Sequence, residues 1–193
     1  MSAIFHITQA NGASPTYKDV GNGIAANYEF NFMSTDDNEI NVDYNNYPIV
    51  AGYNSFEVWI LMRFGDAAGA FNTINNCKFW TNTPCYASGT GISVYSNINA
   101  ANPGGTVLGS FATPVSGVSS VALYNITTGL AAPVSENVYI GAVSGGSITT
   151  PASFTNNAST NSTNFIVLQV QTTSGTSAGT TSDMIWHYSY DEA

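Results

Sequence analysis

Positively charged residues are almost missing from this sequence. The 193 residues include only 3 Lys and Arg against 12 Asp and Glu, which gives a formal net charge of −9 at pH 7. Proteins hold a nucleic-acid backbone mainly through Lys and Arg, and anionic membrane surfaces attract the same residues. The composition therefore argues against direct nucleic-acid binding and against attachment to a membrane.

Charge of either sign is scarce as well. Charged residues make up 8% of the chain, whereas about 25% is usual for a globular domain. Long surface helices use Lys, Glu and Arg for i,i+4 pairing, so such helices are not expected. Asn, Ser and Thr supply the polar surface instead, with 64 residues, a third of the chain. Together with 12% aromatic residues, this composition predicts a folded all-β protein rather than a disordered one.

Long hydrophobic runs are missing too. The longest apolar stretch, residues 56–64, contains Glu57 and Arg63 and is far shorter than the about 20 residues that span a bilayer. No Lys or Arg precedes Lys18, so no secretory signal peptide is indicated. The Asn- and Thr-rich composition nevertheless resembles that of extracellular proteins. A virion protein, made in the host cytoplasm and released by lysis, would reconcile these two observations.

Residue types that carry catalysis are few. His6 and His187 are the only histidines, and we interpret His187, which lies between two aromatic residues, as structural. No nucleophile elbow, phosphate loop or zinc-protease motif occurs. We therefore predict no enzymatic activity, no catalytic residue, no metal site and no cofactor.

The two cysteines, Cys77 and Cys85, leave two interpretations open. Residues 81–84 could turn the chain so that the sulfurs meet, and a disulfide that closes so short a loop stabilises by up to about 2–3 kcal/mol. A reducing cytosol favours two free thiols, which is the interpretation we prefer. Two cysteines alone make a poor metal site, because a structural zinc has four ligands.

One acidic cluster and three glycosylation sequons also occur. The acidic residues are Asp36, Asp37, Glu39 and Asp43. Their oxygens could bind calcium, but they lack the spacing of an EF-hand loop, so a solvated loop is favoured. The sequons begin at Asn125, Asn157 and Asn161. In a chain so rich in Asn, Ser and Thr, such sequons arise by chance, and we assign them no role.

The clearest strand covers residues 55–64, where every second side chain is apolar. Trp59 and Leu61 on its other face indicate that this face is partly covered as well, which predicts a central strand. Residues 164–172 alternate in the same way. From the two stretches we predict these core residues: Phe56, Val58, Ile60, Met62, Ile166, Leu168 and Val170.

The rest of the chain indicates further short strands separated by polar loops. Strands are expected at residues 71–81, 92–95, 107–112, 118–124, 137–143 and 184–190, and long polar loops at 144–164 and 173–181. Residues 1–30 contain two turn signals and should form an arm or a first hairpin. This spacing predicts a single β-sandwich domain over residues 1–193, jelly-roll-like in its connections.

Two parts of the chain carry a family resemblance. The first part is Ser55-Phe56-Glu57-Val58-Trp59-Ile60, then Arg63-Phe64, then Phe71-Asn72-Thr73-Ile74-Asn75-Asn76-Cys77-Lys78-Phe79-Trp80. The second is Val167-Leu168-Gln169-Val170, followed after a Thr/Gly loop by Tyr188-Ser189-Tyr190-Asp191-Glu192. These segments resemble structural proteins of tailed phages and related viruses, whereas residues 89–163 do not. The resemblance implies a β-sandwich on the capsid exterior, often a trimer, and it assigns no catalytic residue.

Taken together, these observations predict a capsid decoration protein located in the virion. It would bind the major capsid protein, assemble with itself as a symmetric oligomer, with a trimer favoured, and stabilise the shell. Two alternatives stay open. One is a carbohydrate-binding module whose exposed aromatic side chains stack on sugars. The other is a cell-surface or filament subunit.

Overall fold

The regular secondary structure in the described part of the protein is almost entirely β-strand. The computed structural model describes residues 3–12, 16–22, 30–36, 44–65, 73–84, 91–100, 115–119, 121–141, 144–148, 162–177 and 184–193. The strands are β1 (Ile4–Asn11), β2 (Thr16–Asn22), β3 (Val58–Gly65), β4 (Ile74–Thr81), β5 (Ile92–Ala100), β6 (Tyr124–Asn125), β7 (Phe165–Thr172) and β8 (Trp186–Glu192). Over these ranges the helical content is one 3-10 turn, η1 (Tyr44–Asn46). The all-β prediction is confirmed.

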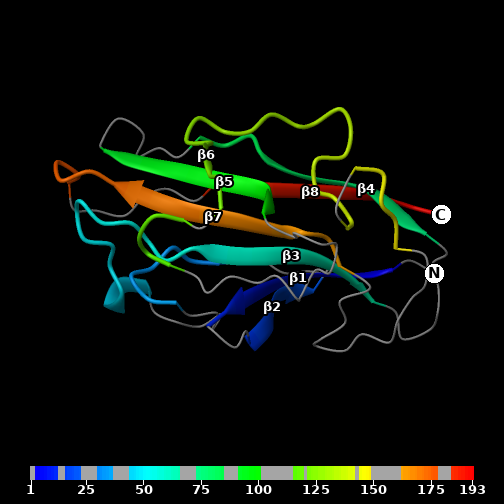
Figure 1. Cartoon of the computed structure of the whole chain (residues 1–193), viewed down its shortest axis with the longest axis horizontal. Helices are drawn as coiled ribbons and strands as arrows, with labels where there is room; N and C mark the ends of the chain where they lie inside the picture. The colour runs from blue at the N-terminus through cyan, green and yellow to red at the C-terminus, as the bar shows by residue number, and fades with distance from the viewer. Residues whose placement is uncertain are drawn as a thin grey trace.

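The strands form two antiparallel sheets. The larger sheet has the order β2-β1-β3-β7-β5-β6, and the smaller one pairs β4 with β8. β1 and β2, which fall in the segment expected to form an arm or a first hairpin, pair with each other, and β1 also pairs with β3. Figure 1 shows both chain ends at one end of the molecule and the turn after β7 at the other. The arrangement is sandwich-like, while the jelly-roll connectivity stays a prediction.

The main core lies between the two sheets. Phe5 of β1 stacks on Tyr188 of β8 with ring centroids 4.1 Å apart, and Phe64 of β3 meets Tyr190 edge-on at 4.8 Å. Six of the seven predicted core residues belong to this cluster. Phe56 is the exception, because β3 begins only at Val58 and the strand alternation does not extend back to it. Phe56 is partly buried, and its backbone N–H bonds to the carbonyl of Met33 at 2.9 Å.

A second apolar cluster covers the opposite face of the larger sheet. Trp59 and Phe165 meet edge-on at 5.3 Å, and every residue of β3 is buried. The cluster consists of Ala10, Trp59, Leu61, Phe165 and Val167, with Val121 and Leu123 packed against it. β3 is therefore a central strand buried on both faces, as its sequence predicted.

Several expected strands take another form. Within residues 118–124 and 137–143, the described residues form a strand only at β6. Residues 107–112 lie outside the described ranges. Irregular residues within 130–141 and 144–148 instead bond to the second edge of β4. Leu130 N–H donates to Thr81 O at 2.6 Å, and Ile74 N–H donates to Ile148 O at 2.9 Å. The backbone N–H and C=O groups of these residues bond to partners far away in the sequence. Composition alone could not distinguish this arrangement from a regular strand, so the strand predicted at residues 137–143 was wrong.

Candidate binding surfaces

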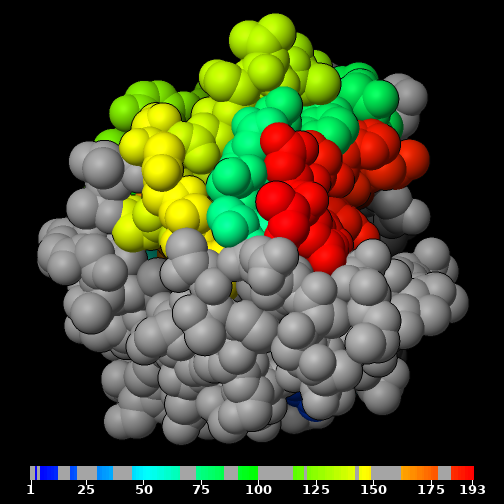
Figure 2. All heavy atoms as spheres, turned by 90° about the vertical axis from the view of Figure 1, so that its right-hand side faces the viewer, coloured from blue at the N-terminus to red at the C-terminus, as the bar shows by residue number. Residues whose placement is uncertain are grey.

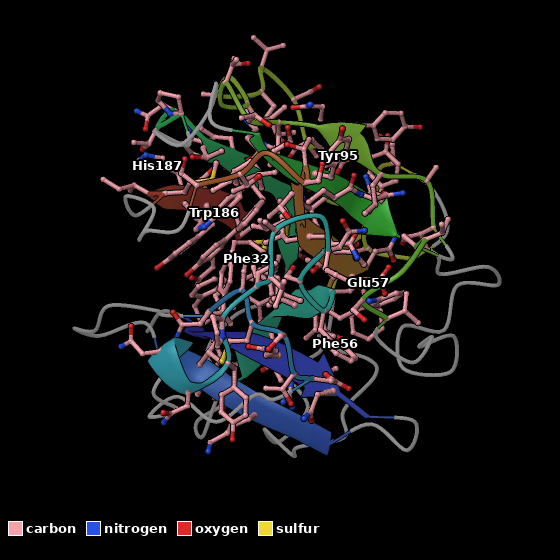
Figure 3. The ribbon with its side chains drawn as sticks, turned by 90° about the vertical axis from the view of Figure 1, so that its left-hand side faces the viewer. Phe32, Phe56, Glu57, Tyr95, Trp186 and His187 are labelled. Atoms are coloured by element: carbon pink, nitrogen blue, oxygen red, sulfur yellow. The ribbon has the colours of Figure 1, made fainter. Side chains whose placement is uncertain are left out.

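His187 lies on the outer side of the smaller sheet. Its ring stacks on Trp80, the residue opposite it on β4, with centroids 5.3 Å apart and an interplanar angle of 17°. Its Nε2 is 2.9 Å from Asn82 Oδ1. Figure 3 shows His187 on the outside of the sandwich and Trp186 on the inner side. These contacts fit the structural role that the sequence suggested for His187.

Cys77 is a buried thiol on β4. Burial, with smaller contributions from the charges of Glu136 and Asp191, raises the pKa of Cys77 from 9.0 to about 12. The thiol is therefore protonated and weakly nucleophilic at neutral pH. Cys85 lies outside the described residues, so the preferred interpretation of two free thiols and the alternative of a Cys77–Cys85 disulfide both stay untested.

The acidic cluster can be followed only at Asp36. Its carboxylate accepts a hydrogen bond from the backbone of Gly12 at 2.7 Å, and its carbonyl accepts one from Asn11 Nδ2 at 3.5 Å. Asp37, Glu39 and Asp43 lie outside the described residues. No group of three or more potential metal ligands is found in the ranges given above.

Of the three sequon asparagines, only Asn125 is described. Asn125 is exposed on β6, and its side-chain oxygen accepts a hydrogen bond from Thr127 N–H at 2.9 Å. Asn157 and Asn161 lie outside the described residues.

A polar cluster on the larger sheet was not anticipated from the sequence. His6 Nδ1 lies 3.0 Å from Asp19 Oδ2, Thr8 Oγ1 donates to Asp19 Oδ1 at 2.6 Å, and Arg63 NH1 lies 3.9 Å from the same oxygen. The carboxylate sits between the hydroxyl and the imidazole, so His6 is not placed to deprotonate Thr8. Burial lowers the pKa of His6, an effect that Asp19 opposes. The cluster therefore ties β2, β1 and β3 together and is not arranged as a catalytic relay.

A second buried polar group holds an irregular segment against the sheet. Glu57 is 2% exposed, and its Oε2 accepts hydrogen bonds from Trp59 Nε1 at 2.8 Å and from the Val115 N–H at 3.4 Å. Gln169 Nε2 lies 3.3 Å from the carbonyls of both Val115 and Gly117. Figure 3 shows Glu57 on the side of the molecule away from His187. These contacts anchor residues 115–117 over the outer face of the larger sheet.

An exposed apolar surface lies at the end of the sandwich remote from the chain ends. We call it the loop-end surface, and Figure 3 looks onto this end of the molecule. Tyr47, Val50 and Tyr53 are 39%, 61% and 69% exposed. Beside them is a hollow of about 220 Å³ lined by Ser34, Val50, Tyr53, Asn54 and Ser116. Among the described residues, this surface is a candidate for binding a small ligand.

Hydrogen bonds hold the backbone of this surface in place. Residues 50–53 form a turn closed by Tyr53 N–H donating to Val50 O at 2.9 Å, with Gly52 supplying the φ of +87° that the turn requires. Thr172 Oγ1 at the end of β7 accepts from Gly52 N–H at 2.9 Å and lies 2.6 Å from Tyr53 O. The exposed side chains are therefore carried by a turn that is bonded to the sheet.

A second exposed surface is the outer face of the smaller sheet. We call it the outer sheet face, and it consists of Lys78, Trp80 and His187 on the two strands, together with Ile185 immediately before β8. Ile185 is 57% exposed, and Val134, whose carbonyl accepts a hydrogen bond from Lys78 Nζ at 3.4 Å, is 100% exposed. Figure 2 shows β4 (green) and β8 (red) side by side at the molecular surface.

Comparison of the chain with protein-family models, with curated proteins and with solved structures found no match. Among the described residues, no helix is long and apolar enough to cross a membrane.

Proposed function

We propose that this protein is a decoration protein on the exterior of a virus capsid, where it binds the assembled shell and stabilises it. The observation that carries the proposal is the outer sheet face. It presents the Trp80–His187 stack on two paired strands and, just before β8, the exposed side chain of Ile185. The resemblance of residues 55–64 and 71–80 to virion structural proteins supports the same role.

The scarcity of charge on the outer sheet face favours contact with another protein. Lys78 and Asp191 are its formally charged residues among those described, and Asn76 Nδ2 donates to Asp191 at 2.8 Å. Uncharged polar and aromatic groups lose less free energy than charged groups when a partner removes water from them. The cores of protein interfaces are depleted in charged residues and enriched in aromatic ones.

The edge of β4 indicates how a partner would approach. Both sides of β4 are already bonded, one to β8 and the other to irregular chain between 130 and 148. Strand addition at β4 would require breaking these bonds. We therefore propose that the partner packs face-on against the side chains of the outer sheet face.

The proposed partners are the major capsid protein and other copies of this chain, arranged as a symmetric oligomer with a trimer favoured. A protein that binds only the assembled shell stabilises it by mass action. Such a role requires no catalytic group. The buried polar clusters around Glu57 and Asp19 form hydrogen bonds within the fold.

The first experiment is to locate the chain on purified particles by mass spectrometry and immunogold labelling. We expect an abundant protein on the capsid surface. Stripping it should lower the temperature at which the shell ruptures, and adding back the purified chain should restore it. Absence from particles, or presence only as a minor tail component, would contradict the location. An unchanged rupture temperature after stripping would contradict the stabilising role.

The second experiment tests the surface. The double variant Ile185→Ser/Val134→Ser should lose rebinding to stripped particles. The matched control is Val50→Ser/Val118→Ser, in segments that are hydrogen-bonded to β7 of the larger sheet. Its side chains are 61% and 96% exposed, against 57% and 100% for the test pair. The control should rebind like the unmodified chain. Equal loss in both variants would rule out the outer sheet face as the attachment surface.

A further inference from the structure

We propose that the hollow of the loop-end surface binds a neutral saccharide, with one sugar ring lying against Tyr53. This site is separate from the outer sheet face, so the saccharide proposal can be tested independently of the capsid role. The inference rests on the residues that line the hollow, on the missing positive charge and on the bonded turn that carries the tyrosine.

The lining combines one aromatic wall with small polar groups. Tyr53 and Val50 provide exposed apolar surface, and Ser34, Asn54 and Ser116 provide hydroxyl and amide groups. The face of an aromatic ring carries partial negative charge and attracts the polarised C–H groups on one face of a sugar. Hydroxyl and amide side chains both donate and accept hydrogen bonds, as sugar hydroxyls do.

The lining also argues against charged ligands. The chain contains three basic residues, Lys18, Arg63 and Lys78, and none of them lines the hollow. Phosphate, sulfate and carboxylate groups are usually held by charge-assisted bonds from Arg or Lys. The net charge of −9 further disfavours an anion. An uncharged ligand rich in hydroxyls is the chemical class that remains.

The size of the hollow favours a small ring over a protein partner. A hollow of about 220 Å³ is below the roughly 300–1,000 Å³ of drug-sized ligand pockets. A stable protein interface needs about 800 Å² from each partner, spread over many residues. The described lining residues therefore form a contact area that suits one terminal sugar of a larger glycan.

Hydrogen bonds already hold the groups that line the hollow, which would reduce the conformational entropy lost on binding. Thr172 bonds the turn that carries Tyr53 to the end of β7, and Asn54 Nδ2 donates to Gly117 O at 3.4 Å. This hydrogen bond restrains the Asn54 amide at the edge of the hollow. Less conformational entropy is lost when a ligand meets groups that are already held in position.

The test uses the full-length chain on an array of oligosaccharides ending in glucose, galactose, mannose or N-acetylglucosamine, together with sialylated versions of the same glycans. We expect at least one neutral glycan to bind. The best of them is then titrated by saturation-transfer NMR against three variants: Tyr53→Ala, Tyr53→Phe and Tyr124→Ala. Tyr124 is the matched control, because it is 68% exposed on β6 whereas Tyr53 is 69% exposed.

Tyr53→Ala should weaken binding by about tenfold, which corresponds to about 1.4 kcal/mol for an aromatic anchor. Tyr53→Phe keeps the ring and should bind within a few-fold of the unmodified chain, which excludes misfolding as the cause of a loss. Tyr124→Ala should bind normally. No neutral glycan on the array, binding of sialylated glycans alone, or equal affinity for Tyr53→Ala would each overturn the proposal.

Discussion

Glu57 and Cys77 show two ways in which burial controls a polar side chain. Glu57 keeps its carboxylate inside the protein because Trp59 and the Val115 backbone donate hydrogen bonds to it. At Cys77, burial raises the pKa of the thiol to about 12, so the thiol is protonated at neutral pH. The hydrogen bonds of Glu57 couple β3 to Val115. The raised pKa of Cys77 makes the free energy of unfolding depend on pH at alkaline values.

Glu57→Ala should destabilise the protein by about 1–3 kcal/mol, because it leaves the buried Trp59 Nε1–H without its acceptor. Urea unfolding followed by fluorescence measures the change. The control is Asp191→Ala, which removes one hydrogen bond from an exposed side chain and should cost less than about 1 kcal/mol. Equal losses in the two variants would mean that the Glu57 contacts do not stabilise the fold.

The stability of the protein should fall as the pH rises above 9, through Cys77. The unfolded thiol loses its proton near 9.0, whereas the folded thiol keeps it to about 12. The unfolded state then binds fewer protons in this window, so the free energy of unfolding decreases with pH. At pH 10.5 the loss should be about 2 kcal/mol relative to pH 7.

Cys77→Ala should lack this component of the pH dependence. The measurement is urea unfolding of both proteins at pH 7 and pH 10.5. If the difference between the two proteins is the same at both pH values, the thiol does not titrate on unfolding. That outcome would indicate that Cys77 is in a disulfide with Cys85, which Ellman titration of the denatured chain would then check.

At the scale of the elements, β3 organises the molecule because it is buried on both faces. One face joins the core between the sheets, and the other joins the cluster around Trp59 and Phe165. β3 pairs with β1 over seven residue pairs and with β7 over three. Substitutions within β3 should therefore cost more than substitutions just before it.

Ile60→Ala and Phe56→Ala test where the strand begins. Ile60 is 0% exposed in the core, and its truncation should cost about 2–5 kcal/mol. Phe56 is partly buried and lies outside the core cluster, so its truncation should cost less than the about 3–5 kcal/mol expected for a buried Phe. Chemical denaturation compares the two. A larger loss for Phe56→Ala would contradict its position in the structure.

At the scale of the whole molecule, the two sheets share one core and should unfold together. Trp59 reports on the cluster outside the larger sheet, while Trp186 packs against the core and stacks on Phe79 at 5.3 Å. The variant Trp80→Phe/Trp186→Phe retains Trp59, and Trp59→Phe/Trp80→Phe retains Trp186. Within each variant, the unfolding transition followed by tryptophan fluorescence should coincide with the transition followed by circular dichroism. If Trp186 fluorescence changes before the circular dichroism signal, the smaller sheet detaches first.

The sequence carried enough information to predict the strands whose side chains alternate regularly. Residues 55–64 and 164–172 became β3 and β7, and six of the seven predicted core residues are buried in the main core. Alternation succeeds there because side chains on a strand point to opposite faces with a period of two. It failed at Phe56 and over residues 118–123 because a composition suited to strands does not fix where pairing begins.

The candidate surfaces could not be predicted in the same way. Tyr53 and Tyr124 are exposed while Tyr188 packs in the core, and composition alone does not separate them. The loop-end surface joins Ser34, residues 50–54 and Ser116, which are distant in the sequence. The cluster of His6, Asp19 and Arg63 likewise depends on the pairing of three strands.

By itself, the sequence determined the all-β class and the scarcity of charged surface, because both follow from composition and local periodicity. The tertiary structure alone decided which aromatic side chains face solvent, which polar groups are buried in contact with one another, and that irregular chain closes the second edge of β4. These features depend on hydrogen bonds and contacts between residues far apart in the chain. No local pattern encodes such contacts, so they exist only once the strands have paired and the sheets have packed.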